Sequence, residues 1–444
     1  MKLLKLAVIA ALAAPFAASA TDGYFQHGYG LKAKGMAGVG TAMAVDAFGG
    51  ANNPASMVWV GDRIDFGADL FSPRRSASRS GSSPLLGPVD GSADSGSNYF
   101  LVPEFGYNKM INPNLSLGIT VYANGGMNTD YPGGQIPALS ACAGFNPNPG
   151  PYNLLCGNGR LGVDLSQLVI APTLAYKLNA NHSIGVSPLI GVQRFKVDGL
   201  QAFDNPFFST SPGNVTNRGH EWAHGFGVRV GWFGKLSDRV NLGAAYSTKV
   251  YMSKFDDYRG LFAEQGDFDM PENYNVGIAV KVSPNVTVAA DYQRINYSDV
   301  KSVGNTQVNL LACAGGNAAF CLGGSKGAGF GWKDVNIIKL GVEYQYDPRW
   351  TWRAGYDRTE NPISGRDIDF NILAPGVVQD HLTFGFTYKT STNGELTFAY
   401  MHAFNHGVTA PSLLNSFVPP GVSAGNASIK MYQNAAGIAY GWKM

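Results

Sequence analysis

The sequence predicts an all-β transmembrane barrel of about 14 antiparallel strands, with an N-terminal segment that plugs the lumen. Short stretches of alternating apolar and polar residues recur between turn-forming residues, and a Gly-rich segment precedes the first of them. Only 14% of the 444 residues are charged, whereas soluble proteins usually carry about a quarter. The formal net charge of +2 gives no reason to expect nucleic acid binding. These features favour an exported membrane protein.

Residues 1–20 have the layout of a secretory signal peptide. Lys2 and Lys5 precede an apolar run over 6–14, and Ala18-Ser19-Ala20 forms a small-residue cleavage site. The apolar run is too short to cross a bilayer as a helix. We therefore expect cleavage before Thr21 and export to the outer membrane of a Gram-negative cell.

The next segment, residues 21–60, is expected to be a hatch inside the barrel. It is rich in Gly and Ala and shows no sustained alternation, yet it carries many large apolar side chains. Disordered segments remain disordered because they have little to bury, so this one must pack against other residues. We expect it to fill the lumen of a barrel formed by residues 61–444.

Alternation is clear along the rest of the chain. In 240–252, residues such as Val240, Leu242 and Tyr246 share one face, while Asn241, Gly243 and Ser247 share the other. The same pattern recurs at 274–282, 338–346, 350–356 and 382–388. Charged side chains are costly on a lipid-facing surface, so we expect four residues to point into the lumen: Lys281, Lys339, Glu343 and Arg353.

Short turns alternate with long Gly-rich and Asn-rich loops, as in bacterial outer-membrane barrels. The barrel must close, because an open sheet edge cannot be hydrated in lipid. The expected long loops are 73–98, 124–163, 199–220, 253–271, 298–333, 359–379 and 406–427.

The four cysteines form two close pairs within these loops, Cys142 with Cys156 and Cys313 with Cys321. An oxidising compartment favours a disulfide within each pair. A zinc site is the alternative, but neither pair has Cys-x2-Cys spacing or a nearby His. We expect these bridges to make the loops rigid.

Several short motifs occur in a fixed order in the mature chain. They are Asn53-Pro54-Ala55 at the end of the hatch, Gly126-Met127-Asn128-Thr129-Asp130-Tyr131 after the third strand, Phe262-Ala263-Glu264-Gln265-Gly266 before the eighth, and Gly331-Trp332-Lys333-Asp334 before the tenth. With these motifs the chain resembles the FadL/TodX family of outer-membrane transporters for long-chain fatty acids and toluene. The resemblance implies a transporter without a cofactor, whose partners are hydrophobic small molecules and outer-membrane lipid. We expect a monomer.

The resemblance also implies a route for the ligand, beginning at an apolar patch on the external loops. The candidate patch residues are Phe203, Phe207, Phe208, Leu261 and Phe262. Alternatively, these side chains only pack the loops against each other. Further in, Arg194 resembles the basic residue that meets a fatty acid head group, and Lys326 and Lys333 are the expected second contributors. Alternatively, Arg194 pairs with Asp198 or another carboxylate in the lumen.

Release is expected to be lateral, through a hole in the wall beside the hatch. In the family, the Asn-Pro-Ala motif lies against an inward kink of the third strand. We place this kink at Gly125-Gly126, because glycine tolerates bulges that break strand pairing. An ordinary strand end is the alternative. Phe25 and its apolar neighbours are expected to occupy the pocket until the hatch shifts.

Other functions fit less well. His402 and His406 share a strand face, as do His220 and His224, but neither pair has a third ligand or a Ser/Asp partner at a known spacing. We therefore expect no catalysis and no metal site. A general porin would need an open lumen, which the apolar hatch argues against. Long-chain fatty acids are the expected substrate, with aromatic hydrocarbons as the alternative.

Overall fold

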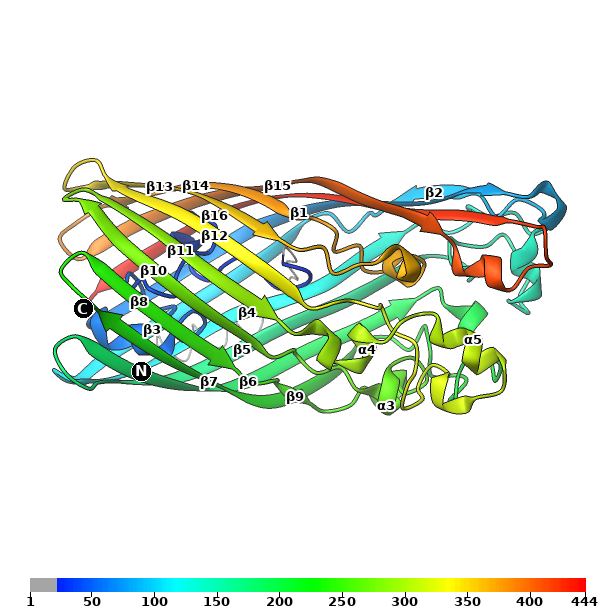
Figure 1. The fold of residues 1–444 in the computed structure, drawn as a ribbon, viewed down its shortest axis with the longest axis horizontal. Coiled ribbons are helices and arrows are strands. Elements are labelled where there is room, and N and C mark those ends of the chain that lie inside the picture. Colours follow the sequence, from blue (N-terminus) through cyan, green and yellow to red (C-terminus); the bar gives the residue numbers. More distant parts are fainter. Residues whose placement is uncertain (1–21) are drawn as a thin grey trace.

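The computed structural model describes residues 22–444, which form a closed antiparallel barrel around the N-terminal segment (Figure 1). The signal peptide predicted at 1–20 lies outside the described residues. The sheet contains 16 strands, of which two short ones, β2 (Gly91–Asp94) and β9 (Tyr251–Met252), lie beside β1 and β7. The other 14 form the wall, so the predicted fold class is confirmed.

The wall strands follow one another around the barrel in chain order, and the last strand pairs with the first along its whole length, from Arg63 opposite Lys443 to Ser82 opposite Ala424. This closure leaves no open edge in lipid. The strands are β1 (Arg63–Ser82), β3 (Phe100–Asn112), β4 (Leu115–Tyr131), β5 (Leu161–Lys177), β6 (His182–Asp198), β7 (Glu221–Lys235), β8 (Val240–Ser247), β10 (Asn273–Ser283), β11 (Val286–Ile295), β12 (Val335–Gln345), β13 (Trp350–Thr359), β14 (Asp380–Lys389), β15 (Gly394–Pro411) and β16 (Ala424–Lys443).

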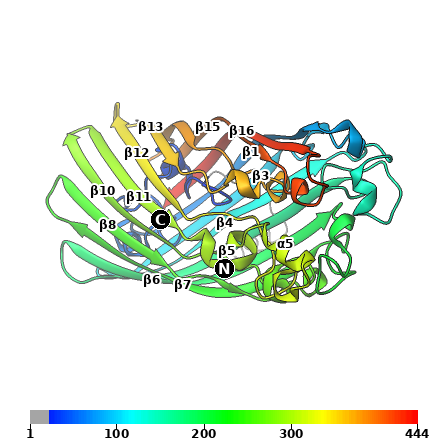
Figure 2. The same ribbon diagram turned by 45° about the vertical axis from the view of Figure 1, so that its right-hand side comes forward.

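Short turns connect the strands at one end of the barrel and long loops at the other, which carries most of the short helices (Figures 1 and 2). Within the described residues, no helix is long and apolar enough to cross a membrane. The helices are α2 (Leu31–Lys34), α3 (Ala263–Gly266), α4 (Lys301–Gly304) and α5 (Asn309–Ala314). The 3-10 helices are η1 (Pro54–Trp59), η2 (Pro84–Leu86), η3 (Ala141–Gly144), η4 (Gln201–Phe203), η5 (Asp256–Tyr258), η6 (Tyr297–Asp299), η7 (Ala318–Phe320), η8 (Gly365–Asp367), η9 (Phe370–Ile372) and η10 (Leu413–Ser416).

The two faces of the wall differ as the alternation predicts. On β10, Val276 and Ile278 are 50% and 39% exposed on the outside, whereas Asn275 and Ala279 are buried inside. Lys339 and Arg353 are buried on the inner face. Apolar side chains therefore face lipid and polar side chains face the lumen.

Several strand ends lie further out than the sequence suggested. The loops expected to begin at residues 73, 124 and 406 begin after Ser82, Tyr131 and Pro411. The extensions of β1 and β4 are rich in Ser, Arg, Asn and Gly, so they lack the apolar alternation of a lipid-facing strand. Backbone pairing with a neighbouring strand continues through all three extensions. The stretch 240–252 is also divided, because β8 ends at Ser247 and the chain pairs with β7 again only at Tyr251.

Residues 22–60 lie inside the barrel and are attached to its inner face by buried polar contacts (Figure 1). Lys34 forms ion pairs with Asp69 on β1 and Glu104 on β3. On β11, one carboxylate oxygen of Asp291 accepts hydrogen bonds from the backbone N–H groups of Gly40 and Thr41, both at 2.9 Å. The segment is therefore attached to several strands of the wall from the inside.

Candidate transport pathway

The N-terminal arm, defined here as residues 22–27, contributes Tyr24 to a buried aromatic cluster. The Tyr24 ring centroid lies 5.0 Å from that of Tyr297 and 5.8 Å from that of Trp332. Phe25 packs edge-on against Tyr297 at 5.9 Å. The backbone N–H of Tyr24 donates to the Tyr297 hydroxyl at 3.2 Å. Both arm residues are thus buried between the hatch and the long loops, and Tyr24 lies at the centre of the cluster.

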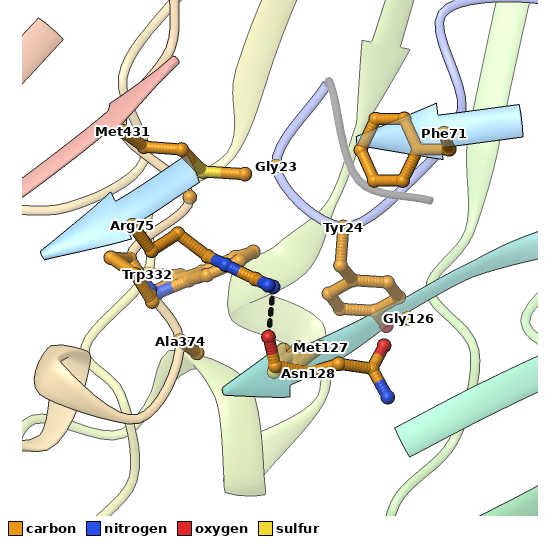
Figure 3. A pocket seen from close by; sticks show the side chains of 12 residues that line it. Gly23, Tyr24, Phe71, Arg75, Gly126, Met127, Asn128, Trp332, Ala374 and Met431 are labelled. Atoms are coloured by element: carbon orange, nitrogen blue, oxygen red, sulfur yellow. Dashed lines mark hydrogen bonds between the residues drawn. The ribbon is translucent and has the colours of Figure 1, made fainter. Parts of the chain in front are cut away.

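A pocket in the lumen lies directly against this arm (Figure 3). Its walls are mostly apolar, and Arg75 is its one ionisable group besides Tyr24 among the described lining residues. Its free volume is about 20 Å³, enough for about one water molecule, so a ligand with an apolar chain would fit only after the arm has moved. The main side chains of the walls are Tyr24, Phe71, Arg75, Met127, Trp332 and Met431.

Arg75 is on the inner face of β1, on the same side of the strand as Phe71. Its guanidinium donates to the backbone oxygens of Asn128 on β4 and of Ser97, and the first of these bonds is drawn in Figure 3. Among the described residues, no carboxylate lies within ion-pair distance of this guanidinium, and its Nε–H has no hydrogen-bond partner. A buried cation without a counter-ion is costly, so this position is suited to an anionic group.

A bulge in β4 faces the N-terminal arm. The register between β4 and β5 shifts between Ala123 and Gly125, and Gly125 forms an antiparallel bridge with Phe25. The N–H of Gly126 donates to the Tyr24 oxygen at 3.0 Å, and the N–H of Gln26 donates to the Asn124 oxygen at 3.2 Å. The register shift thus falls at Asn124, directly before the Gly125-Gly126 pair predicted for the kink, and both glycines lie within the strand and not after it.

Beside this bulge, the wall is interrupted. Pairing between β3 and β4 ends at Glu104 opposite Tyr122, while β4 continues to pair with β5 as far as Tyr131. The chain meets β4 again above the gap, where the N–H of Gly96 donates to the Asp130 oxygen at 2.8 Å. Asn128 lines both the lumen pocket and a cleft of about 440 Å³ outside it. The contact between Arg75 and Asn128 therefore lies between the lumen and the outside.

Aromatic residues of the long loops line two further apolar pockets. Phe203 is shared by both, Phe208 lines one, and Leu261 and Phe262 line the other. Phe208 and Phe262 are almost completely buried, and only Phe207, at 52% exposure, presents most of its ring to solvent among these patch candidates. The expected external patch is thus largely a set of enclosed pockets, because the rings pack against each other, as with Phe203 and Phe208 at 5.6 Å.

The three basic residues predicted from the sequence do not reach these pockets. Arg194 is on the outer face of β6, which it shares with the exposed Ile190, because Gln193 and Phe195 take the inward positions. It pairs with Asp164 at 3.0 Å and not with Asp198. Lys326 and Lys333 are exposed in the loops. Assigning these residues to a lumen head-group site was therefore wrong.

Arg75 was missed because β1 was expected to end before residue 73. The signal is present in the sequence, since Phe71, Arg75 and Arg79 have the spacing of one strand face.

The Asn-Pro-Ala motif lies away from the strand kink, contrary to expectation. Asn53 donates through its side chain to the Thr41 oxygen at 2.9 Å and to the Trp232 oxygen at 2.8 Å, and its own amide oxygen caps η1. Pro54 packs over Gly185 of β6, and the Ser183 hydroxyl donates to the Ala55 oxygen at 2.7 Å. The motif thus attaches the hatch to β6 and β7, whereas Tyr24 to Gln26 contact the kink.

The remaining candidate residues are found in the loops and on the wall. Disulfides join Cys142 to Cys156 and Cys313 to Cys321. His220 contacts the Asp164 carboxylate at 2.7 Å, and His402 contacts the Asn434 side chain at 2.9 Å. In the part of the chain that the structure describes, one group of three potential metal ligands occurs elsewhere, at Asp22, Asp357 and His381.

A closed antiparallel barrel with an apolar outer face, short turns at one end and long loops at the other is the architecture of bacterial outer-membrane proteins. The family described as "Outer membrane protein transport protein (OMPP1/FadL/TodX)" matches residues 156–416, and the chain belongs to this family. Its members are transporters, so the protein is an outer-membrane transporter and not an enzyme.

Individual relatives are more distant. The long-chain fatty acid transport protein of Salmonella typhi is 24% identical over 399 residues, which cover 81% of this chain and 82% of that protein. The structure of the Pseudomonas putida toluene transporter TodX superposes with a TM-score of 0.64 at 16% identity, covering 94% of this chain and 99% of that one. The structure of a Pseudomonas aeruginosa FadL homologue superposes with a TM-score of 0.66 at 15% identity, covering 95% of this chain and 99% of that one. These structures share the fold.

Proposed function

We propose that the protein transports long-chain fatty acids and that Arg75 binds the carboxylate. The observation that carries this proposal is the buried guanidinium of Arg75, which borders a mostly apolar pocket and has no described carboxylate partner. A bound fatty acid would supply the missing negative charge, while its chain would contact Phe71, Trp332 and Met431. A charge-assisted hydrogen bond in such a setting contributes about 1.5–3 kcal/mol.

The proposed route begins in the apolar pockets lined by Phe203 and Phe262 and leads to the lumen pocket. Tyr24 closes the way between them, so the N-terminal arm has to move while the rest of the hatch stays in place. The ligand then leaves through the gap between β3 and β4, where Arg75 bridges to Asn128. One chain contains this whole route, so a monomer suffices.

Aromatic hydrocarbons are the second candidate. The lumen pocket is bordered by the rings of Tyr24, Phe71 and Trp332, which would suit a flat neutral ligand. Such a ligand would not need Arg75. The Salmonella typhi relative is named for fatty acids and TodX for toluene, so uptake has to be measured for both ligand classes.

The test is uptake of labelled oleate and labelled toluene by cells that lack their own carriers and express this chain. In the Arg75→Met variant we expect oleate uptake at low concentration to fall at least about tenfold, which corresponds to about 1.4 kcal/mol, while toluene uptake persists. The control is Arg239→Met, which removes an exposed arginine from the short turn between β7 and β8 and should leave the uptake of both compounds unchanged.

Oleate uptake that does not depend on Arg75 would contradict the carboxylate site. Toluene uptake without oleate uptake would assign the chain to aromatic hydrocarbons. If neither compound is taken up, single-channel conductance would test the general porin alternative. Heat-dependent migration in gels would verify that each variant forms a barrel.

A further inference from the structure

Three ionisable residues from distant parts of the chain meet in the lumen at the base of the N-terminal arm. Asp22 belongs to the arm, and Asp357 on β13 lies opposite His381 on β14 in the strand register. One ligand atom from each residue lies within 4.8 Å of the other two. All three residues are completely buried.

Most of the polar atoms in this group have no partner among the described residues. Both carboxylate oxygens of Asp357, both ring nitrogens of His381 and Oδ1 of Asp22 lack a hydrogen bond. The closest approach of His381 to Asp357 is 3.8 Å, which is longer than a hydrogen bond. Leaving a buried polar atom unsatisfied costs about 1–3 kcal/mol, so five such atoms in one place point to a missing ligand.

Neighbouring charged groups do not satisfy these unpartnered atoms. Lys339 on β12 donates to Oδ2 of Asp22 at 3.1 Å and to the backbone oxygen of His27, so it neutralises one of the two carboxylates. The ring of His27 stacks on that of His381 with centroids 6.4 Å apart, and its Nε2 also lacks a partner. If both carboxylates are ionised and both imidazoles are neutral, the group retains one negative charge that Lys339 does not neutralise.

We propose that Asp22, Asp357 and His381 bind a divalent transition-metal ion such as Zn²⁺. Two carboxylate oxygens and an imidazole nitrogen form a ligand set typical of zinc, manganese or iron, whereas calcium and magnesium prefer oxygen alone. His27 or a water molecule would complete the coordination. The ion would turn the net charge of the group from −1 to +1 and satisfy the atoms that now lack partners.

The ion would also connect the N-terminal arm to the wall. Asp22 is two residues from Tyr24, which borders the lumen pocket, and its metal partners lie on β13 and β14. Binding would therefore hold the arm in the position that closes the pocket. This inference does not depend on which compound is transported, because metal binding is measured without a transport substrate.

The experiment uses the full chain purified from outer membranes in detergent, stripped with a chelator and then loaded with Zn²⁺ or Co²⁺. We expect about one equivalent of Zn²⁺ by elemental analysis and visible absorption bands with Co²⁺. Asp357→Asn and His381→Gln should each weaken binding at least about 100-fold, since even residues that only support metal ligands contribute up to this factor. Zn²⁺ should slow hydrogen exchange of residues 22–27.

Two variants serve as matched controls. Asp291→Asn removes another buried carboxylate of the lumen, outside the proposed site, whose Oδ2 accepts three hydrogen bonds from Gly40 and Thr41 and whose Oδ1 lacks a partner among the described residues. His402→Gln removes a histidine that already contacts Asn434. Both should keep the metal. Equal binding by all variants would overturn the proposal, as would the absence of stoichiometric binding to a barrel that migrates as folded. A proton shared by the two carboxylates would then be the compensating charge.

Discussion

At the scale of single residues, the long loops are held to the barrel by the buried ion pair between Arg79 and Asp369. Arg79 on β1 contacts Asp369 at 2.5 Å and also donates to the Leu154 oxygen and the Ser412 hydroxyl. Both side chains border the apolar pocket that contains Phe203 and Phe208. One inward-facing arginine therefore connects three of the long loops.

Replacing Arg79 by Met should release this region, because it leaves the Asp369 carboxylate buried without a counter-ion. The expected cost is about 3–5 kcal/mol, observed as faster hydrogen exchange of residues 365–373 and earlier cleavage by protease. The double variant Arg79→Met/Asp369→Leu removes both charges and should regain most of the protection. If both variants lose the same amount of protection, packing of these side chains, and not their charge, would be what stabilises this region.

Asp267 should make the loop between β9 and β10 sensitive to pH. Burial and the nearby carboxylates of Asp269 and Glu264 raise the pKa of Asp267 to about 6, whereas an aspartate in an unfolded loop has a pKa near 4. Between about pH 4 and 6 the folded loop binds more protons than the unfolded loop, so its stability falls as the pH rises through this window.

The measurement is hydrogen exchange of residues 253–272, corrected for the intrinsic pH dependence. Asp267→Asn should protect the loop at pH 7.5, by on the order of 1 kcal/mol after allowance for solvent screening, and should have little effect at pH 4. Protection of the same size at both pH values would contradict a role for this carboxyl group.

At the scale of the elements, the bulge of β4 requires a residue without a side chain. A Cβ atom on Gly125 would lie 1.7 Å from the backbone oxygen of Tyr24. Gly125→Ala should therefore push the N-terminal arm away from the strand, and hydrogen exchange of residues 24–27 should rise at least about tenfold. Gly144→Ala is the control, since a Cβ there meets no atom within 4 Å. Unchanged exchange in Gly125→Ala would mean that the contact is not needed to hold the arm.

The sequence predicted the elements better than it predicted the site. Alternation and turn residues gave the 14 wall strands, because a lipid-facing surface imposes a strict period of two. Strand ends beyond the membrane are polar on both faces, so β1 was expected to end before residue 73 and Arg75 was not recognised as an inward residue. Arg194 was misplaced because a short motif does not fix which face of a strand a residue occupies.

Contacts between distant segments could not be predicted from local patterns. Asp22 meets Asp357 and His381 only because the arm is folded back inside the closed barrel. The Asn-Pro-Ala motif identified the end of the hatch, but its partners on β6 and β7 depend on how the whole segment packs.

At the scale of the whole molecule, the hatch has two parts that are held differently. Residues 31–60 are fixed by ion pairs and hydrogen bonds to wall residues that include Asp69, Glu104, Asp291 and Glu395. The arm, residues 22–27, is held mainly by aromatic packing, by backbone bonds to β4 and by the ion pair between Asp22 and Lys339. We therefore expect the arm to move during transport while the rest of the hatch stays in place.

Two deletions should separate these parts. Removal of residues 22–27 should open the lumen pocket and speed the uptake of hydrophobic compounds, while ion conductance in planar bilayers stays low because residues 31–60 still fill the barrel. Removal of residues 22–60 should leave a wide polar pore, with conductance like that of a porin. If the short deletion already conducts like the long one, the arm and not the body of the hatch closes the barrel. If the long deletion does not conduct, the loops alone seal it, and the ligand would have to be admitted by movement of the loops.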